Sequence, residues 1–494
     1  MPLPLPKLDQ YTFDELVGQG QSLLPRYAPG WTDHNVHDPG ITLLELFAWL
    51  AEMESYRLDR VTEASTRAFL RLVGIEPKPA QVAETVLVAL PEEFGAAKQL
   101  PARTKVTTVD RSVTFQTTHP VWVSPAKLVA VLAGPPGVLT DYSVRNDPSS
   151  KRFPSFAPDP QIGHALYLGF DRPLADLPAV ITLYVWSGDS ERDRQARELL
   201  KAEAKAIDEE AKKCPPGRHP HMVDWRQHYS VHTVWEYYAG AEQWLPLLET
   251  VDGTRAFTLS GAVHFKAPER SQHLPDGVSL SGHASHYFFR CRLVSGRYDC
   301  SPDTRYIQIN AVQATHAVDG DQRYSLGKSN GRAGQTYLLP EKPIVPRSTT
   351  LYVRVSATVE QDWNEYLSWD RTGPHAHGYV LDPERGEIRF GNGRSGAVPK
   401  AGAELAVTYQ VGGGPTGNVK TESLTRLFTS TDLSKKQFSQ PFAAVGGAPA
   451  EPLFDAKARA VVWLSTPHRA VTLTDFEQLA LATPGVPIGR AKAL

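Results

Sequence analysis

The sequence predicts an α+β multidomain protein with an N-terminal helical segment, several β-rich domains of antiparallel, sandwich-like type, and a C-terminal α/β part. The chain has 494 residues, whereas an ordinary domain has about 100–200 residues, so several domains are expected. Apolar residues recur with helical spacing before residue 77 and in short strand-like runs after it. The 40 prolines and 37 glycines are spread along the chain, which is typical of many short strands joined by turns.

Composition excludes several classes of protein. Hydrophobic residues make up 41% and charged residues 21%, which allows large cores, and a formal charge of -2 gives no basic field for nucleic acid. The 3 cysteines cannot form a disulfide framework and fit a reducing cytosol. The N-terminus "MPLPLPKLDQ" lacks the pattern of a signal peptide. The apolar stretch Ile41 to Ala51 falls short of the about 20 residues that span a bilayer, so we expect a soluble chain assembled in the cytoplasm, with no membrane span.

Changes in periodicity and composition divide the chain into six expected segments. These are an N-terminal helical bundle segment (1–76), a β-rich domain (77–190), an inserted charged helix and loop (191–230), a second β-rich domain (231–345), a third (346–425), and an incomplete C-terminal α/β segment (426–494).

The first segment contains three expected helices. Thr12 and Glu15 form a capping box for the first. The N-cap motif Asp38, Pro39 and Gly40 starts the second, which runs to about Arg60, because Asp38 can accept the first free N–H groups and Pro39 needs no hydrogen bond at that position. The third spans about 63–73 and ends at Gly74.

The second helix is apolar on nearly every side. At 100° per residue, its apolar residues cover most of the helix circumference, and such a helix must be covered on most sides. They are Ile41, Leu43, Leu44, Leu46, Phe47, Trp49, Leu50, Met53 and Tyr56. It could bury these residues against the adjacent β domain of its own chain or against a helix of another chain. We favour the partner helix, since two short helices form a thin cover.

The β-rich region is predicted from short runs bounded by turn residues. They include "ETVLVAL", "VTFQTT", "PVWVSP", "HALYLGF", "VITLYVW", "VHTVWEYYAGAEQWLPL", "HYFFRCRLVSGRY" and "RYIQIN". In "ELAVTYQV", alternation places Leu405, Val407, Tyr409 and Val411 on one face, and "GEIRFGNGRSG" reads as a strand entering a turn. The inserted segment from Glu191 to Cys214 carries a thin apolar stripe on a charged helix: Ala196, Leu200, Ala204, Ile207 and Ala211. Two further helices are expected near 455–464 and 474–482.

Two histidine clusters are candidate metal sites. His34 and His37, flanked by Asp33 and Asp38, could bind zinc, but they precede Pro39 in a segment that disfavours helix, so loop and cap roles are preferred. The second cluster, His283, His286, Cys291 and Cys300, does not have a zinc spacing. Alternation in a strand would put Cys291 on the face of Phe289 and Leu293, as a buried core thiol. We therefore predict no metal site and no cofactor.

Catalytic signals are weak. The stretch "GGGPTGNV" (412–419) lacks the Lys-Ser/Thr of a phosphate loop and reads as a turn in which glycine supplies positive φ. Carboxylates Asp382, Glu384 and Glu387 lie in an expected turn between strands. A set of aromatic and imidazole side chains could line a sugar groove, but core positions are commoner for such residues: Trp363, Trp369, His375 and His377. We expect no catalytic residues and a protein that is not an enzyme. The alternatives are a cell-wall or glycan hydrolase using one of the carboxylates, or a receptor-binding tail component.

Several long stretches, in order, resemble the baseplate wedge proteins, the J-like baseplate assembly proteins of contractile phage tails and contractile injection systems. They are "TDHNVHDPGITLLELFAWLAEMESYRLDRV", "FQTTHPVWVSPAKL", "LYLGFDRPL", "WEYYAGAEQWLPL", "DGTRAFTLSGAVHF", "GKSNGRAGQTYLL", "IRFGNGRSGAVPKAGAELAVTYQVGGGPTGNV", "HRAVTLTDFEQLALATPGV" and "GRAKAL". The family includes phage, extracellular and membrane-anchored systems.

The resemblance implies a structural wedge subunit that links the central spike or hub to the sheath and holds the extended state until contraction is triggered. Implied partners are a second wedge protein, a sheath-initiating baseplate protein, the spike or hub protein and neighbouring wedges in a sixfold ring, in a phage tail-like particle. Two departures stand out. The charged helix at 191–213 resembles an insertion into the β region and has no assigned family role. Family members usually continue beyond "RAKAL", which is why the last segment is expected to be incomplete.

Overall fold

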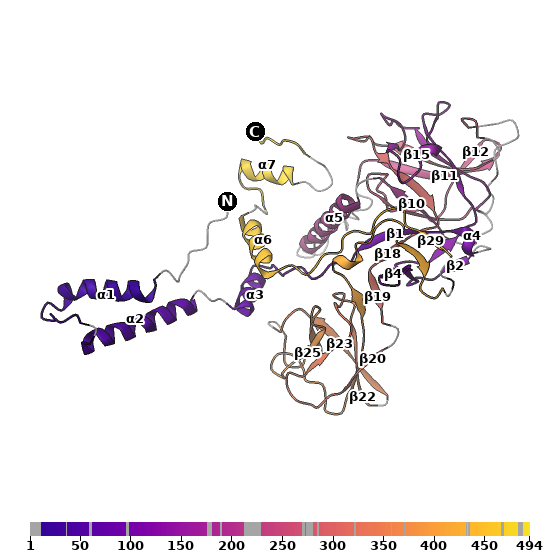
Figure 1. Ribbon diagram of the computed structural model, residues 1–494. Coiled ribbons are helices and arrows are strands. Elements are labelled where there is room, and N and C mark those ends of the chain that lie inside the picture. The colour runs from indigo at the N-terminus through magenta and orange to yellow at the C-terminus, as the bar shows by residue number, and fades with distance from the viewer. Residues whose placement is uncertain are drawn as a thin grey trace. The chain divides into compact units, whose positions relative to one another are not determined.

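The computed structural model describes residues 11–35, 37–58, 62–94, 98–174, 180–187, 190–211, 229–268, 272, 280–283, 286–320, 323–356, 358–369, 372–430, 432, 435–465, 469–482 and 488–494. The chain divides into two compact units. The first comprises Met1–Lys78, Glu451–Leu479 and Ala493–Leu494, and the second comprises Pro79–Ala450 and Ala480–Lys492. An N-terminal helical segment and several antiparallel sheets confirm the predicted α+β multidomain fold (Figure 1). Of the helices described, none has the length and apolar character needed to cross a bilayer.

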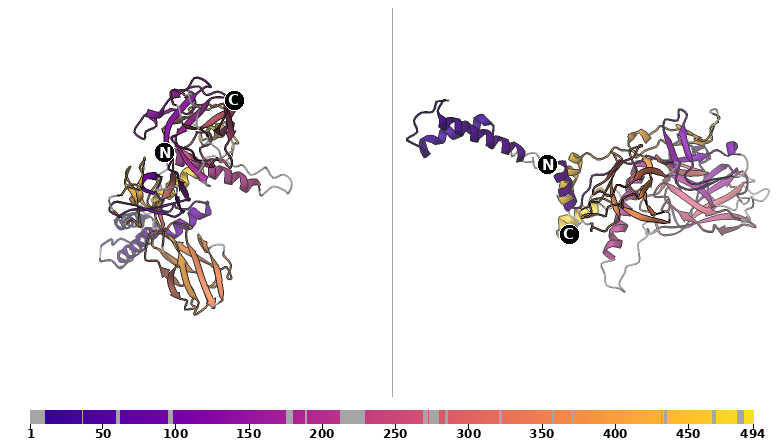
Figure 2. Two further views of the ribbon diagram at one scale, coloured as in Figure 1. Left: turned by 90° about the vertical axis from the view of Figure 1, so that its right-hand side faces the viewer. Right: turned by 90° about the horizontal axis from the view of Figure 1, so that it is seen from below.

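The first unit is helical. Its helices are α1 (Phe13–Tyr27), α2 (Pro39–Leu58), α3 (Glu63–Leu72), α6 (Leu453–Ser465) and most of α7 (Leu473–Leu481). Helices α1 and α2 lie side by side as a hairpin, and α3 packs beside α6 (Figure 2). The start of α2 at Pro39 is as predicted, while its expected end near Arg60 lies outside the described residues.

The largest core of the second unit lies between two sheets. The six-stranded sheet has the order β12 (Gln243–Pro246), β11 (His232–Gly240), β15 (Tyr287–Ser295), β9 (Ala165–Phe170), β6 (Leu128–Gly134) and β7 (Thr140–Asp141). The four-stranded sheet has the order β13 (Val251–Asp252), β14 (Gly261–Lys266), β10 (Val180–Trp186) and β17 (Tyr306–Ile309). Buried side chains from both sheets, such as Leu168, Leu183 and Phe289, form one apolar cluster. This is the packing of a sandwich.

A second sheet system joins distant parts of the chain. Its order is β28 (Leu424–Leu427), β3 (Lys105–Thr108), β4 (Thr114–Thr117), β18 (Ala311–Thr315), β1 (Glu84–Ala89) and β29 (Phe438–Ser439). The two-stranded sheet of β2 (Lys98–Leu100) and β5 (Val121–Val123) contributes Leu100 and Val121 to the same core as Phe115. Strand β1 therefore pairs with strands more than 200 residues away, β18 and β29.

The third β region is a seven-stranded sheet. Its order is β20 (Tyr324–Lys328), β26 (Glu404–Thr408), β22 (Thr350–Ser356), β23 (Val359–Tyr366), β24 (Gly378–Asp382), β25 (Glu387–Phe390) and β21 (Thr336–Leu338). Its pairs are antiparallel except β23 with β24. Leu405, Val407 and Tyr409 are buried while Ala406 and Thr408 are less so, which confirms the predicted alternation for these residues. Val411, the fourth residue predicted on this face, is half-buried. The short elements are α4 (Pro91–Phe94), β8 (Phe153–Pro154), β16 (Asp303–Thr304), β19 (Ala317–Asp319), β27 (Gln410–Gly412), η1 (Ser143–Arg145) and η2 (Pro415–Gly417).

The inserted charged helix is α5 (Ser190–Ala211), and polar side chains fasten its first turns to the segment before β14. The Ser260 backbone N–H donates to Asp193 Oδ2 at 3.1 Å, and Arg197 Nη2 donates to the Gly253 carbonyl at 3.0 Å. Leu200, in the predicted apolar stripe, is buried. The expected end at Cys214 lies outside the described residues.

Candidate assembly interface

The start of α2 is fixed by its own sequence. Asp38 Oδ1 accepts hydrogen bonds from the backbone N–H groups of Gly40 at 2.7 Å and Ile41 at 3.1 Å. These are two of the donors that have no partner inside the helix, so the carboxylate satisfies them as an N-cap. Gly40 sits so close to the Trp31 ring that a Cβ there would approach a ring carbon to 2.2 Å. A larger residue would push the loop away from the helix start.

One side of α2 is covered by α1. A Cβ on Gly20 of α1 would approach the Leu44 side chain to 2.8 Å, so the two helices meet closely at that point. The Phe13 backbone N–H donates to Glu52 Oε1 at 3.1 Å. Ile41 and Ala48 share this side of α2 by helical periodicity, and both are buried.

The opposite side of α2 is uncovered. Leu43, Leu46 and Leu50 keep 55%, 47% and 37% of their surface exposed. Their spacing of three and four residues forms a seam into which the side chains of a further helix can pack. Phe47 and Trp49 widen the apolar surface on either side of this seam and are also more than half exposed. We call these five residues the α2 seam.

The structure divides the nine residues predicted to contact a partner helix. Ile41 lies on the covered side of α2 and is 1% exposed, so it supports the hairpin of its own chain. Leu44 and Met53 are half-buried, and Tyr56 is exposed near the end of the helix. Periodicity alone could not separate these groups, because apolar residues occupy both sides of the helix.

A second pair of helices, α3 and α6, forms a small core of its own. Leu70 and Ile75 pack with Ala456 and Ala460. A forked ion pair stabilises the entry into α6. Arg459 donates from Nε to Glu451 Oε1 at 2.9 Å and from Nη2 to Glu451 Oε2 at 2.7 Å, and its Nη2 also reaches the Glu76 carbonyl at 2.7 Å.

These bonds hold the pKa of the Glu451 carboxyl below its ordinary value. The hydrogen bonds from Arg459 are the main cause, because they stabilise the ionised form of Glu451.

Further apolar surface lies on α3, α6 and α7. The exposed side chains of this kind are Phe69, Leu72, Phe454, Val461, Leu464, Leu473 and Phe476. Phe454 and Val461 point away from the side of α6 that Ala456 and Ala460 use against α3. Both C-terminal helices were predicted from the sequence, but no interface was predicted on them. The signal was present in "EPLFDAKARAVVWLS", where apolar residues surround most of the helix, as they do in α2.

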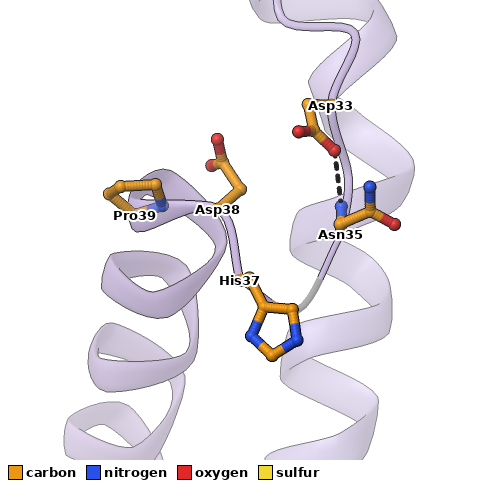
Figure 3. Close-up of a pocket in the computed structure, with 5 residues that line it drawn as sticks. All are labelled: Asp33, Asn35, His37, Asp38 and Pro39. Carbon is orange, nitrogen blue, oxygen red and sulfur yellow. Dashed lines mark hydrogen bonds between the residues drawn. The ribbon is translucent and has the colours of Figure 1, made fainter.

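The two N-terminal histidines lie in the loop between α1 and α2. The His34 ring nitrogen Nε2 is 3.1 Å from the Trp31 carbonyl. His37 lines an open hollow of about 410 Å³ with Asp33, Asn35, Asp38 and Pro39. Figure 3 shows its ring pointing away from the carboxylates of Asp33 and Asp38, which bind the Asn35 N–H and cap α2 respectively. Across the described residues, no three histidine, cysteine or acidic side chains gather as metal ligands would.

The two cysteines of the second candidate metal site lie in different environments. Cys291 is fully buried in β15, in the same cluster as Phe289 and Leu293, as predicted. Burial raises the pKa of its thiol well above the ordinary value, so it is not a reactive thiolate. Cys300 is exposed. His283 Nε2 donates to Asp141 Oδ2 at 2.9 Å, so its contact is with a carboxylate.

The carboxylates considered as catalytic candidates stabilise a β-hairpin. Asp382 and Glu387 are cross-strand partners in β24 and β25. Asp382 Oδ1 accepts from the Arg385 N–H at 3.1 Å, and Glu387 Oε1 accepts from Arg389 Nε at 2.6 Å. In the glycine-rich stretch, Gly413 and Gly414 adopt φ of +100° and +81°, which confirms its interpretation as a turn.

Comparisons with solved structures give two baseplate assemblies. The first is a cryo-electron microscopy structure of the type VI secretion system TssK-TssF-TssG baseplate subcomplex, with 13% identity, a TM-score of 0.39, and coverage of 87% of this chain and 78% of that chain. The second is the anti-feeding prophage baseplate, with 9% identity, a TM-score of 0.28, and coverage of 94% of this chain and 56% of that one. This chain therefore spans just over half the length of the second matched chain. No family model matches the sequence, and no curated protein does.

Proposed function

We propose that this chain is a structural wedge subunit of the baseplate of a contractile phage tail or contractile injection system. The observation that carries the proposal is the α2 seam, an apolar helix side that the chain's own α1 leaves uncovered. Such a side is stabilised when a further helix covers it. The first of the ordered sequence motifs that resemble wedge proteins spans this same helix.

In this proposal the seam packs against a helix of a second wedge protein within each wedge. The other partners are a sheath-initiating baseplate protein, the spike or hub protein and neighbouring wedges of a sixfold ring. The exposed apolar residues of α3, α6 and α7 are a second surface for such contacts. The chain acts without cofactor or catalysis: it links the hub to the sheath and holds the sheath extended until the trigger. Assembly takes place in the cytoplasm.

The contacts of the carboxylates in the β24–β25 hairpin favour a structural role over a hydrolase. Glu387 is held by Arg389, and Asp382 stabilises the turn that follows it. Peptidoglycan or glycan hydrolysis by the pure chain, lost in Glu387→Gln, would favour the hydrolase instead.

The proposal is tested by removing the chain from the native system and counting sheathed particles by electron microscopy. We expect no complete particles without the chain, and recovery when it is supplied again. Free tube and sheath protein should remain present, since their own synthesis does not depend on the baseplate. Sheathed particles of normal number and length in its absence would exclude a wedge function.

A further inference from the structure

The seven-stranded sheet carries a hollow of about 290 Å³ at one end of β25. Its lining comes from three stretches of the chain: Gly334, Trp369, and Arg389, Phe390, Asn392 and Ser395. Small-molecule sites have volumes of about 300–1,000 Å³, so this hollow suits one small ligand rather than an extended one.

The backbone around the hollow is held in place by hydrogen bonds. Asn392 Oδ1 accepts from the N–H groups of Arg394 at 2.9 Å and Ser395 at 2.8 Å. The Gly334 N–H donates to the Gly391 carbonyl at 3.0 Å, which ties the β21 side to the β25 side. A Cβ on Gly396 would approach the Trp369 ring to 2.2 Å, so the turn lies directly against the indole. The walls are thus formed before a ligand enters, which lowers the entropy lost on binding.

The charge in the hollow is balanced. Arg389 Nε donates to Glu387 Oε1 at 2.6 Å, and the Glu387 side chain is largely buried. This pairing neutralises the guanidinium, so the hollow favours a neutral ligand over a phosphate or carboxylate. Arg389 still offers its remaining N–H donors in a fixed plane.

The lining is amphipathic. Phe390 is buried beneath the hollow, and the Trp369 indole forms an apolar wall. Ser395 adds a hydroxyl, and because Asn392 Oδ1 serves the turn, a ligand meets this side chain through its Nδ2 donor. A ligand that fits must therefore carry hydroxyl groups on its edge and C–H groups on a face.

We infer that this hollow binds a single neutral hexopyranose ring. A pyranose has an apolar C–H face for the Trp369 indole, and hydroxyls for Arg389, Asn392 and Ser395. The site is independent of the assembly surfaces on the helices, and its binding does not require that the chain be a baseplate component.

The test is saturation-transfer NMR on the purified full chain, with glucose, galactose, mannose and N-acetylglucosamine as separate probes. At least one sugar should bind saturably and weakly, since one ring offers few contacts. Ser395→Ala and Arg389→Ala should each weaken that binding at least threefold. The matched control is Arg385→Ala, in the same hairpin and mostly exposed, which should leave binding unchanged.

Trp369→Leu should abolish binding, and its thermal unfolding curve shows whether the chain still folds. If that variant is unfolded, the Ser395 and Arg389 variants decide the question. No saturable signal with any of the four sugars would overturn the inference. So would binding that is equally strong in wild type, Ser395→Ala and Arg389→Ala.

Discussion

Replacing the leucines of the α2 seam by glutamine separates assembly from folding. The variant is Leu43→Gln, Leu46→Gln and Leu50→Gln together. All three side chains lie on the side of α2 away from α1. Glutamine has nearly the same helix propensity as leucine, so α2 should still form. Replacements at exposed positions change the free energy of unfolding by about 0.5 kcal/mol or less each. The isolated variant should therefore unfold close to the wild-type temperature.

The expected loss of assembly follows from the exposed fractions. Full burial of a leucine side chain stabilises by about 1.5–3 kcal/mol. These three leucines have roughly half of their surface left to bury (55%, 47% and 37%). Each should contribute about 1 kcal/mol to binding a partner helix, and the three together about 3 kcal/mol. Since about 1.4 kcal/mol is a tenfold change in Kd, the variant should bind its partner about a hundredfold more weakly. Burying three glutamine amides without hydrogen-bond partners would weaken it further.

The assay is complementation in the native system, with sheathed particles counted by electron microscopy. A matched control replaces three exposed apolar residues of the β-rich unit by glutamine: Val138, Val144 and Ile162. The control should assemble normally, because the same kind of surface is removed far along the chain from α2. Normal particle numbers with the α2 variant would refute the assignment of the seam to assembly. A strong loss of thermal stability in the isolated variant would show instead that the seam is covered within its own chain.

Three smaller changes test single interactions in the purified chain, the first by amide exchange and the other two by urea unfolding. Asp38→Ala removes the N-cap of α2 and should lower its helical stability by about 1 kcal/mol, seen as faster amide exchange in the first turn. Gly396→Val forces a Cβ into the Trp369 ring at a φ of +77° and should destabilise the β region by at least about 2 kcal/mol, whereas an unchanged midpoint would contradict the contact. Glu451→Gln breaks the fork with Arg459 and should cost about 1 kcal/mol at neutral pH. Because the pKa of Glu451 is lowered in the folded chain, its contribution is present above the pKa of the unfolded state and is lost as the pH falls through the folded pKa, so wild type and variant should converge in acid.

Local features were predictable from sequence because they depend on neighbouring residues. The start of α2 follows from Asp38 and Pro39, which satisfy or remove the first helix donors. The buried face of β26 follows from alternation at Leu405 and Val407, since a strand turns each successive side chain to the opposite face. In both cases the residues that determine the structure lie close together in the sequence.

Long-range partners were not predictable in the same way. Helix α6 packs on α3 through Leu70 and Ala456, which lie hundreds of residues apart, and small residues such as alanine carry little signal of a packing role. The covered side of α2 depends on the close approach of Gly20, which a hydrophobic pattern does not record. The hollow beside β25 likewise depends on bringing Trp369 next to the turn at Gly396. Each of these requires the tertiary structure.

The contrast between the two units leads to a final prediction. The β sheets enclose apolar clusters that are largely buried, with residues such as Leu168 and Phe115 below 2% exposed, so the cores of this unit are already filled by its own side chains. Helices α1 and α2 have 15 and 20 residues, and helices in proteins owe most of their stability to the packing of an apolar face. Only one side of α2 packs against α1, and the seam adds nothing to the stability of this hairpin until a partner helix covers it.

Hydrogen exchange on the isolated chain should therefore show fast exchange in α1 and α2 and slow exchange in strands such as β9 and β15. In assembled particles the amides of α2 should slow by at least tenfold, while those of the strands change little, because covering the seam stabilises only the helix that carries it. Equal protection of α2 in the isolated and assembled states would mean that the hairpin is complete by itself. The apolar seam would then need another explanation than a partner helix.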